Sequence, residues 1–230
     1  MKLLGWDIEA SNLSADFGII LCVGFKEVGK GKPEVLNILD YTKSNNLIKA
    51  EKRLLVDVSE RLLDSDAWLG HFACYYDIPF VNTRLLYHRL PILPANHPLV
   101  DTWRVSKNRL KLRNNRLITI SEFFGTEDEK NSIKPEQWLR ALGGHRPSMD
   151  YIVEHCRRDV MVLEEVYHIL QPLVPNHPSA TLGEEGCSHC GSQKLQKRGF
   201  HLTTQNRYQR FQCQDCGAWG RTSKAIKQTS

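Results

Sequence analysis

The sequence contains no run of 18 consecutive apolar residues, so it offers no candidate for a membrane-spanning helix. It also lacks internal repeats and low-complexity tracts, which argues against solenoid and fibrous architectures. Asp7 and Glu9 fall within the first nine residues and leave no room for the apolar core of a secretory signal. We therefore expect a cytoplasmic protein with no membrane partner, whose seven cysteines do not form a disulfide framework.

The remaining composition is that of a globular protein. Of the 230 residues, 41% are hydrophobic and 25% are charged, and the length suits one mid-sized domain plus a small appendage. The net charge of +5 is unevenly distributed, because residues 183–230 contain eight basic and three acidic residues whereas the rest is balanced. A small basic module favours phosphate-bearing partners, although a basic tail that serves only solubility has the same composition.

A second concentration of positive charge lies between Trp103 and Leu117, where no acidic residue occurs. Its six cations are Arg104, Lys107, Arg109, Lys111, Arg113 and Arg116. Such a run is either a solvated face or a set of phosphate contacts, and the missing counter-charges keep nucleic acid as a candidate partner.

The pattern of apolar residues predicts an α/β fold with a mixed sheet. Three strands are expected first, at Leu3–Ala10, Ile19–Lys26 and Glu34–Asp40, followed by a helix at Asn46–Asp64. Further strands are expected at 67–72 and 99–102, and further helices at 78–89, 118–125, 135–142 and 149–170. This order predicts a first domain over residues 1–171, a proline-containing linker over 172–186, and a second domain over 187–230.

The second domain contains two similar cysteine motifs. The motifs are Cys187-Ser188-His189-Cys190-Gly191 and Cys213-Gln214-Asp215-Cys216-Gly217, and 22 residues separate Cys190 from Cys213. Each two-residue spacer allows one turn to present two thiolates to the same ion, and four thiolates complete a tetrahedral Zn²⁺ site. Because no position remains for water, we expect one structural rather than catalytic Zn²⁺. The module resembles the zinc ribbons found in nucleic-acid enzymes and some transposases.

Cations and aromatic residues alternate between the two cysteine motifs. The cations are Lys194, Lys197, Arg198, Arg207 and Arg210, and the aromatic residues are Phe200, Tyr208 and Phe211. This mixture suits phosphate contact and base stacking. The aromatic residues have an alternative role as the small core beside the zinc, and we expect at least one of them to be buried there. A protein partner docking on the ribbon also stays open.

Acidic residues in two segments, the first strand and the start of a later helix, are candidates for metal binding. In the first strand Asp7 and Glu9 share one face, where a divalent cation would relieve their repulsion. Asp77 opens a helix that has Pro79 in its first turn, which a plain N-cap would also explain.

A further carboxylate interrupts the apolar face of the last long helix. That face consists of Ile152, Cys156, Leu163, Val166 and Leu170, and Asp159 occupies the position between Cys156 and Leu163. A buried carboxylate is costly unless it is paired or bound to a metal. His155 lies four residues earlier on the same face, so a structural Asp–His pair is the alternative to a metal ligand.

Taken together, Asp7-x-Glu9, Gly70-His71-x-x-x-Tyr75-Tyr76-Asp77 and His155-x-x-x-Asp159 resemble the three motifs of the DEDD (DnaQ-like) 3′–5′ exonuclease superfamily. The resemblance covers about residues 3–170 and implies a ribonuclease H-like fold. It further implies that Asp7, Glu9, Asp77 and Asp159 hold two Mg²⁺ or Mn²⁺ ions. The implied substrate is nucleic acid with a free 3′ end. We expect a single strand, with DNA favoured over RNA although no residue decides between them.

Two positions depart from the family pattern. Phe72 stands where the family often has Asn, five residues before Asp77. The third motif combines the spacing of the family's tyrosine branch with a histidine, so His155 acts either as a general base or as a residue that orients water. Two alternatives to the exonuclease remain: an endonuclease or resolvase on the same fold, and a catalytically silent module that binds nucleic acid.

Overall fold

The computed structural model describes residues 1–42, 46–126, 133–178 and 186–226. The chain divides into two compact units, Lys2–Tyr167 and His168–Ser230, the second of which also includes Met1. Within the described ranges, no helix combines the length and the apolar character needed to cross a membrane.

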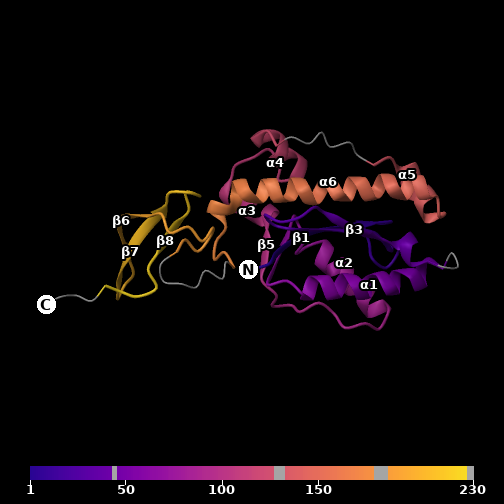
Figure 1. The fold of residues 1–230 in the computed structure, drawn as a ribbon, viewed down its shortest axis with the longest axis horizontal. Helices are drawn as coiled ribbons and strands as arrows, with labels where there is room; N and C mark the ends of the chain where they lie inside the picture. The colour runs from indigo at the N-terminus through magenta and orange to yellow at the C-terminus, as the bar shows by residue number, and fades with distance from the viewer. Residues whose placement is uncertain (43–45, 127–132, 179–185, 227–230) are drawn as a thin grey trace. The chain divides into compact units, whose positions relative to one another are not determined.

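The larger unit is built on a five-stranded mixed sheet with the strand order β3-β2-β1-β4-β5 (Figure 1). Its strands are β1 (Leu3–Ala10), β2 (Ile20–Glu27), β3 (Glu34–Asn37), β4 (Ala67–Gly70) and β5 (Leu99–Asp101). The central strand β1 pairs antiparallel with β2 and parallel with β4, and β4 pairs parallel with β5. The predicted α/β fold with a mixed sheet is therefore confirmed.

Helices cover both faces of this sheet. They are α1 (Leu47–Leu63), α2 (Asp77–Tyr87), α3 (Thr102–Arg109), α4 (Leu117–Phe124), α5 (Pro135–Leu142) and α6 (Arg146–Leu170). In Figure 1, α6 runs along one side of the sheet while α1 and α2 lie on the other. Two short 3₁₀ helices, η1 (Ile38–Tyr41) and η2 (Gln171–Leu173), complete the described helical segments.

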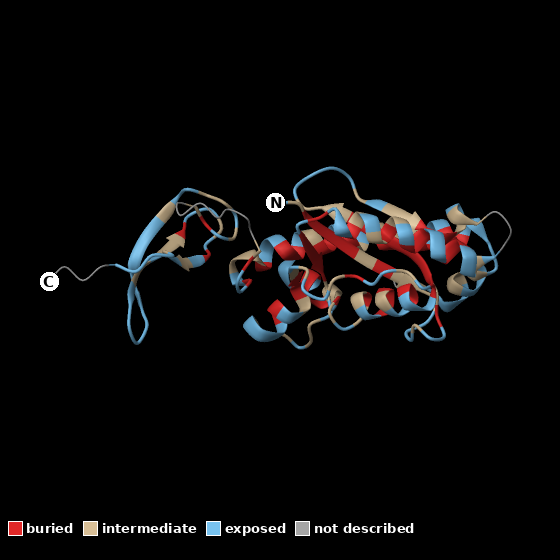
Figure 2. Cartoon of the chain, turned by 90° about the horizontal axis from the view of Figure 1, so that it is seen from below, coloured by how far each residue is buried: buried red, intermediate tan, exposed pale blue. Residues whose placement is uncertain are grey.

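The sheet face toward α1 carries the main apolar core. Trp6 of β1 and Trp68 of β4 are both fully buried, and their rings meet edge to face with centroids 6.1 Å apart. The Trp68 indole N–H donates to the carbonyl of Leu62 in α1, which satisfies this buried donor. Figure 2 shows the strands of the sheet in red, the colour of buried residues, between partly exposed helices.

A buried ionic cluster anchors the segment that connects β1 with β2. Glu51 of α1 is fully buried and accepts hydrogen bonds from the backbone N–H of Ile20 and from the guanidinium of Arg84. The His88 ring lies 2.7 Å from the same carboxylate, and Arg84 also donates to the carbonyl of Ala15. This cluster satisfies a buried charge with several donors and fixes the chain immediately after β1.

The opposite face of the sheet lies against α6 at close range. A Cβ atom placed on Gly24 of β2 would come within 2.9 Å of the Cys156 Sγ atom and 3.1 Å of the Cys156 carbonyl oxygen. Only glycine therefore allows α6 to pass this close to the sheet. Since Gly24 pairs with Asp7 across the β1–β2 ladder, the approach brings α6 directly to the acidic face of β1.

Several predicted elements differ from the structure in their bounds. The third strand ends at Asn37 rather than Asp40, because Asn37 donates to the Asp40 carboxylate and the chain turns into η1. The fourth strand ends at Gly70 rather than Phe72, and part of the basic run forms the unpredicted helix α3. Part of the predicted linker, 179–185, lies outside the described residues, so the proposed domain boundaries stay predictions.

The smaller unit contains a three-stranded antiparallel sheet of β6 (Leu195–Leu202), β7 (Arg207–Cys213) and β8 (Trp219–Arg221). Its buried cluster is formed by Cys187, Cys213 and Ala218. The expectation that Phe200, Tyr208 or Phe211 is a core residue was wrong, because Phe200 is 41% exposed and the other two are only half-buried. Figure 2 shows little red in this unit, which indicates that the cysteine cluster takes the place of an apolar core.

Candidate functional site

The site begins on the central strand of the sheet. Asp7 and Glu9 of β1 are half-buried, whereas Ile8 between them is buried in the opposite layer. Their side chains therefore lie on the face toward α6. The charges of both residues help to raise the pKa of the Cys156 thiol, after the contact with Cys22 and burial, which places both carboxylates near the middle of α6.

Helix α6 supplies the next two groups. The Nε2 atom of His155 lies 3.8 Å from Oε1 of Glu9 and 3.6 Å from Oδ2 of Asp159. All three side chains are between 12% and 15% exposed, and one ligand atom from each lies within 4.8 Å of the others. The separation of 3.6 Å is that of an ion pair rather than of a short hydrogen bond, so a structural Asp–His pair stays an alternative to a metal ligand at this position.

Asp77 joins the site from α2. Its Oδ1 atom accepts a hydrogen bond of 3.1 Å from the backbone N–H of Ile8, the residue between Asp7 and Glu9. The structure makes Tyr76 the N-cap position of α2 and gives it no side-chain cap, so the plain N-cap interpretation of Asp77 is wrong. Instead the Asp77 carboxylate reaches across to the central strand.

Burial raises the pKa of Asp77 to about 7, and the nearby charge of Asp101 acts in the same direction. The hydrogen bond from Ile8 opposes this shift without cancelling it. The pKa of the neighbouring Tyr76 is likewise raised, to about 12, first by burial and then by the charges of Asp77, Glu9 and Asp7. All three carboxylates, from two segments, therefore lie close enough to this hydroxyl for their charges to raise its pKa.

Asp101, at the end of β5, belongs to the site's support and was not singled out from the sequence. Its carboxylate accepts hydrogen bonds from the backbone N–H groups of Phe72, Cys74 and Arg104. It thereby caps α3 and holds the 71–76 segment that leads into Asp77. The available signal was an Asp that ends a strand and precedes a polar, helix-compatible segment.

An exposed aromatic cluster lies on the same segment. Phe72 and Tyr75 are 38% and 58% exposed, and both rings contact Trp103 of α3 with centroids 4.9 and 5.4 Å away. Lys107 places its ammonium 4.5 Å from the centre of the Trp103 ring. The six cations predicted as phosphate contacts between Trp103 and Leu117 are all exposed, and Arg113 pairs with Glu122.

The donor set at β1, α2 and α6 fits divalent cations. It consists of carboxylate oxygens and one imidazole. Arg157 and Arg158 of α6 donate to Glu154 and so do not neutralise these carboxylates. A buried carboxylate whose pKa is raised by desolvation is stabilised in its charged form by a cation. Oxygen-rich sets of this kind suit Mg²⁺ or Mn²⁺.

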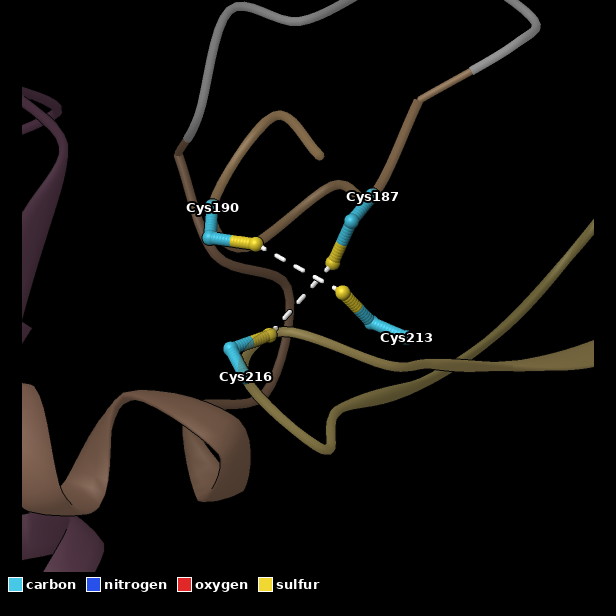
Figure 3. Close-up of side chains that lie close together, drawn as sticks. All are labelled: Cys187, Cys190, Cys213 and Cys216. Carbon is cyan, nitrogen blue, oxygen red and sulfur yellow. Dashed lines mark hydrogen bonds between the residues drawn. The ribbon is translucent and has the colours of Figure 1, made fainter. Parts of the chain in front are cut away.

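The four predicted cysteine ligands of the smaller unit converge on one point (Figure 3). The Sγ atoms of Cys187 and Cys216 are 3.7 Å apart, and those of Cys190 and Cys213 are 3.6 Å apart. A tetrahedron with Zn–S bonds of about 2.3 Å has edges of about 3.8 Å, so the separations fit Zn²⁺ and exclude disulfides. Both motifs use the same turn, in which Gly191 and Gly217 have φ of 79° and 75°.

A family model of the RNase H superfamily matches residues 5–171 of this sequence, which contain all the acidic groups described above. The chain belongs to the RNase H superfamily. Among solved structures, the chain is similar to the family B DNA polymerase from the hyperthermophilic archaeon Pyrobaculum calidifontis, with a TM-score of 0.57 and 16% sequence identity. The similarity covers 75% of this chain and 25% of the polymerase chain.

At this identity the polymerase similarity shows the fold alone, and the present chain spans about a quarter of the polymerase's length. The search of curated proteins found no match to the sequence. Membership of the RNase H superfamily thus rests on the family match, and the placement of Glu9, His155 and Asp159 comes from the structure itself.

Proposed function

We propose that this RNase H superfamily protein is a metal-dependent 3′–5′ exonuclease that hydrolyses phosphodiester bonds in nucleic acid. The observation that carries this proposal is the convergence of Glu9, His155 and Asp159 within 4.8 Å. Asp77 adds to it through its hydrogen bond to the backbone between Asp7 and Glu9. Membership of the superfamily and the similarity to a DNA polymerase favour nucleic acid as the substrate.

Four carboxylates have a defined role in this proposal. Asp7, Glu9, Asp77 and Asp159 would hold two Mg²⁺ or Mn²⁺ ions, which when bound lower the pKa of a water molecule and neutralise charge on the scissile phosphate. The buried hydrogen bond from Ile8 orients Asp77, and the close passage of α6 over Gly24 orients Asp159. A one-residue shift of either element would move a ligand oxygen by several ångströms.

His155 accepts a proton from the attacking water in this scheme. The water oxygen bonds to phosphorus as the bond to the 3′ oxygen breaks, and the departing 3′ oxygen takes a proton from solvent, so the products are a 5′-nucleotide and a shortened chain with a new 3′-hydroxyl. Imidazole is the side chain that most often accepts a proton in general base catalysis. The Nε2 atom lies near both Glu9 and Asp159, which orients the ring toward the acidic groups.

The smaller unit contributes to binding rather than to hydrolysis. Four thiolates would close the coordination of one structural Zn²⁺ and leave no position for a reacting water. The exposed cations of the ribbon, including Lys197, Arg198, Arg207 and Arg210, would raise the local concentration of single-stranded substrate at the nuclease. A protein partner on the ribbon would instead leave substrate affinity unchanged when residues 183–230 are removed.

The test uses the full chain with 5′-labelled single- and double-stranded DNA and RNA, in the presence and absence of Mg²⁺. We expect a ladder that shortens from the 3′ end, and its loss in Asp7→Ala but not in the exposed α6 control Asp150→Asn. Cutting of a closed circular strand would replace the exonuclease with an endonuclease. Binding of nucleic acid without hydrolysis under every divalent cation would refute the enzyme altogether.

A further inference from the structure

One face of the ribbon sheet combines two arginines with two aromatic rings. Strand alternation and the β7–β8 register place Tyr208, Arg210, Trp219 and Arg221 on the same face, which we call the arginine face. His201 of β6 extends it, because His201 pairs with Tyr208 and their ring centroids are 6.2 Å apart. Arg207 and Phe211 alternate with these residues and lie on the opposite face.

Arg210 and Arg221 are direct cross-strand partners in the β7–β8 ladder. Like charges in directly opposite positions destabilise a sheet unless an anion lies between them. The only acidic residue within 186–226 is Asp215, whose carboxylate is engaged by Ser192 and Lys194 outside this face. Within residues 186–226 the arginine pair therefore has no acidic partner, and its positive charge is available to an external anion.

Both guanidinium groups are held in place before any ligand arrives. Arg221 stacks over Tyr208 with its Cζ atom 4.0 Å from the ring centre, and Arg210 lies 5.1 Å from the centre of the Trp219 ring. Arg210 also donates from Nε to the carbonyl of Arg198 and Arg221 donates to that of Thr222. These contacts restrict the side chains, so less entropy is lost when the remaining donors bind a phosphate.

The aromatic residues of this face are not used by the core of the unit. Trp219 is 51% exposed, and the buried cluster consists of Cys187, Cys213 and Ala218 instead. On the opposite face the Phe211 ring covers Gly220, where an added Cβ would lie 2.5 Å from the ring. The opposite face also has one arginine–ring pair, with the Arg207 Cζ atom 3.3 Å from the centre of the Phe200 ring, whereas the arginine face has two such pairs.

We propose that the arginine face binds single-stranded nucleic acid, with a backbone phosphate between Arg210 and Arg221 and bases stacked on Tyr208 and Trp219. Paired arginines suit the phosphate, and exposed rings suit bases that are not already stacked in a duplex. An acidic peptide would satisfy the charges but not the rings. This inference rests on the proposed function only for the class of substrate and adds the ribbon residues that recognise it.

The experiment measures binding of a fluorescent 20-nucleotide single strand to the full chain carrying Asp7→Asn, without chelator, so that neither cleavage nor zinc loss interferes. We expect Arg210→Gln/Arg221→Gln to weaken binding by about tenfold or more and to reduce the salt slope by about 0.7, the contribution of the one phosphate that the pair contacts. Trp219→Leu should weaken binding by about tenfold with an unchanged slope. The control Lys197→Gln/Arg207→Gln removes the same charge from the other face and should lose less.

Bound zinc, measured for every variant, shows that the ribbon is folded. Equal losses for the two double variants would overturn the inference, as would tighter binding of duplex or of polyglutamate than of the single strand. This experiment measures binding and not cleavage. A wild-type chain that cleaves no substrate but still binds the single strand through Arg210 and Arg221 would refute the proposed exonuclease and support this inference.

Discussion

The carboxylate of Asp101 accepts a hydrogen bond from the backbone N–H of Phe72, a residue whose φ of 66° lies in the left-handed region. Bulky side chains rarely adopt this conformation, whereas Asn does so more readily. The departure noted in the second motif, Phe72 where the resembled exonuclease superfamily often has Asn, is therefore a difference in backbone strain. Asp101 and the rings of Tyr75 and Trp103 hold the strained residue in place.

Asp101→Ala should lower the free energy of unfolding of the larger unit by about 2–4 kcal/mol, because three backbone N–H groups lose a charged acceptor. Chemical denaturation of the full chain, followed by tryptophan fluorescence, measures this loss. The matched control is Asp150→Ala, which removes an exposed ion pair with Arg146 and should cost no more than about 0.5 kcal/mol. A loss below 1 kcal/mol for Asp101→Ala would contradict the capping role.

Gly24→Ala should destabilise the larger unit by about 1–3 kcal/mol, because the new methyl group overlaps Cys156 and Val160 of α6. The displaced helix should also carry His155 and Asp159 away from Glu9 and reduce metal binding. Calorimetry of unfolding and of Mn²⁺ binding checks both effects. Adding Cys156→Ala should restore part of the stability by vacating the closest contact, and a fully stable Gly24→Ala would disprove the steric argument.

Asp77→Asn should leave the metal-free protein as stable as the wild type or more stable at pH 8. At that pH the wild-type carboxylate, with a pKa raised to about 7, is charged and buried, whereas the amide oxygen still accepts from Ile8. The stabilisation by Mg²⁺ should disappear in the variant. Melting temperatures with and without Mg²⁺ measure both quantities, and an equal shift in the two proteins would remove Asp77 from the metal site.

His97 should make the larger unit less stable as the pH falls from about 7. Its ring stacks on Trp68 at 4.1 Å, and burial lowers its pKa below the ordinary value of 6.5. The unfolded chain therefore takes up the proton at a higher pH than the folded chain, and stability is lost as the pH falls. His97→Phe keeps a ring but does not titrate, so its unfolding should depend less on pH between 7.5 and 5. Identical pH profiles would exclude His97 as a cause.

Removal of zinc should unfold the smaller unit and leave the larger one intact. The buried cluster of the ribbon consists mainly of its cysteine ligands. When the ion leaves, the thiolates repel one another and no apolar core remains to hold the sheet together. One zinc per chain is expected by elemental analysis, and Cys216→Ser should abolish its retention. In NMR spectra of the backbone amides, only the dispersed signals of β6, β7 and β8 should then disappear. Persistence of those signals after complete chelation would show that the sheet folds without metal.

The sequence predicted those parts of the site that follow from local periodicity. The alternation of β1 placed Asp7 and Glu9 on one face, and the apolar face of α6 made Asp159 conspicuous. Local periodicity does not predict tertiary contacts. Glu51 has the polar character of an exposed helix residue yet is fully buried, because Arg84 of α2 and His88 just after α2 contact its carboxylate. Only the β7–β8 register shows that Arg221 and Trp219 share a face with Arg210.

The acidic groups are contributed by β1, α2 and α6, so residues 7 and 159 lie at nearly opposite ends of the larger unit's sequence. During synthesis on the ribosome, the strand that carries Asp7 and Glu9 emerges well before the helix that completes the constellation. A partly translated chain therefore has no assembled acidic centre until α6 has docked on the sheet.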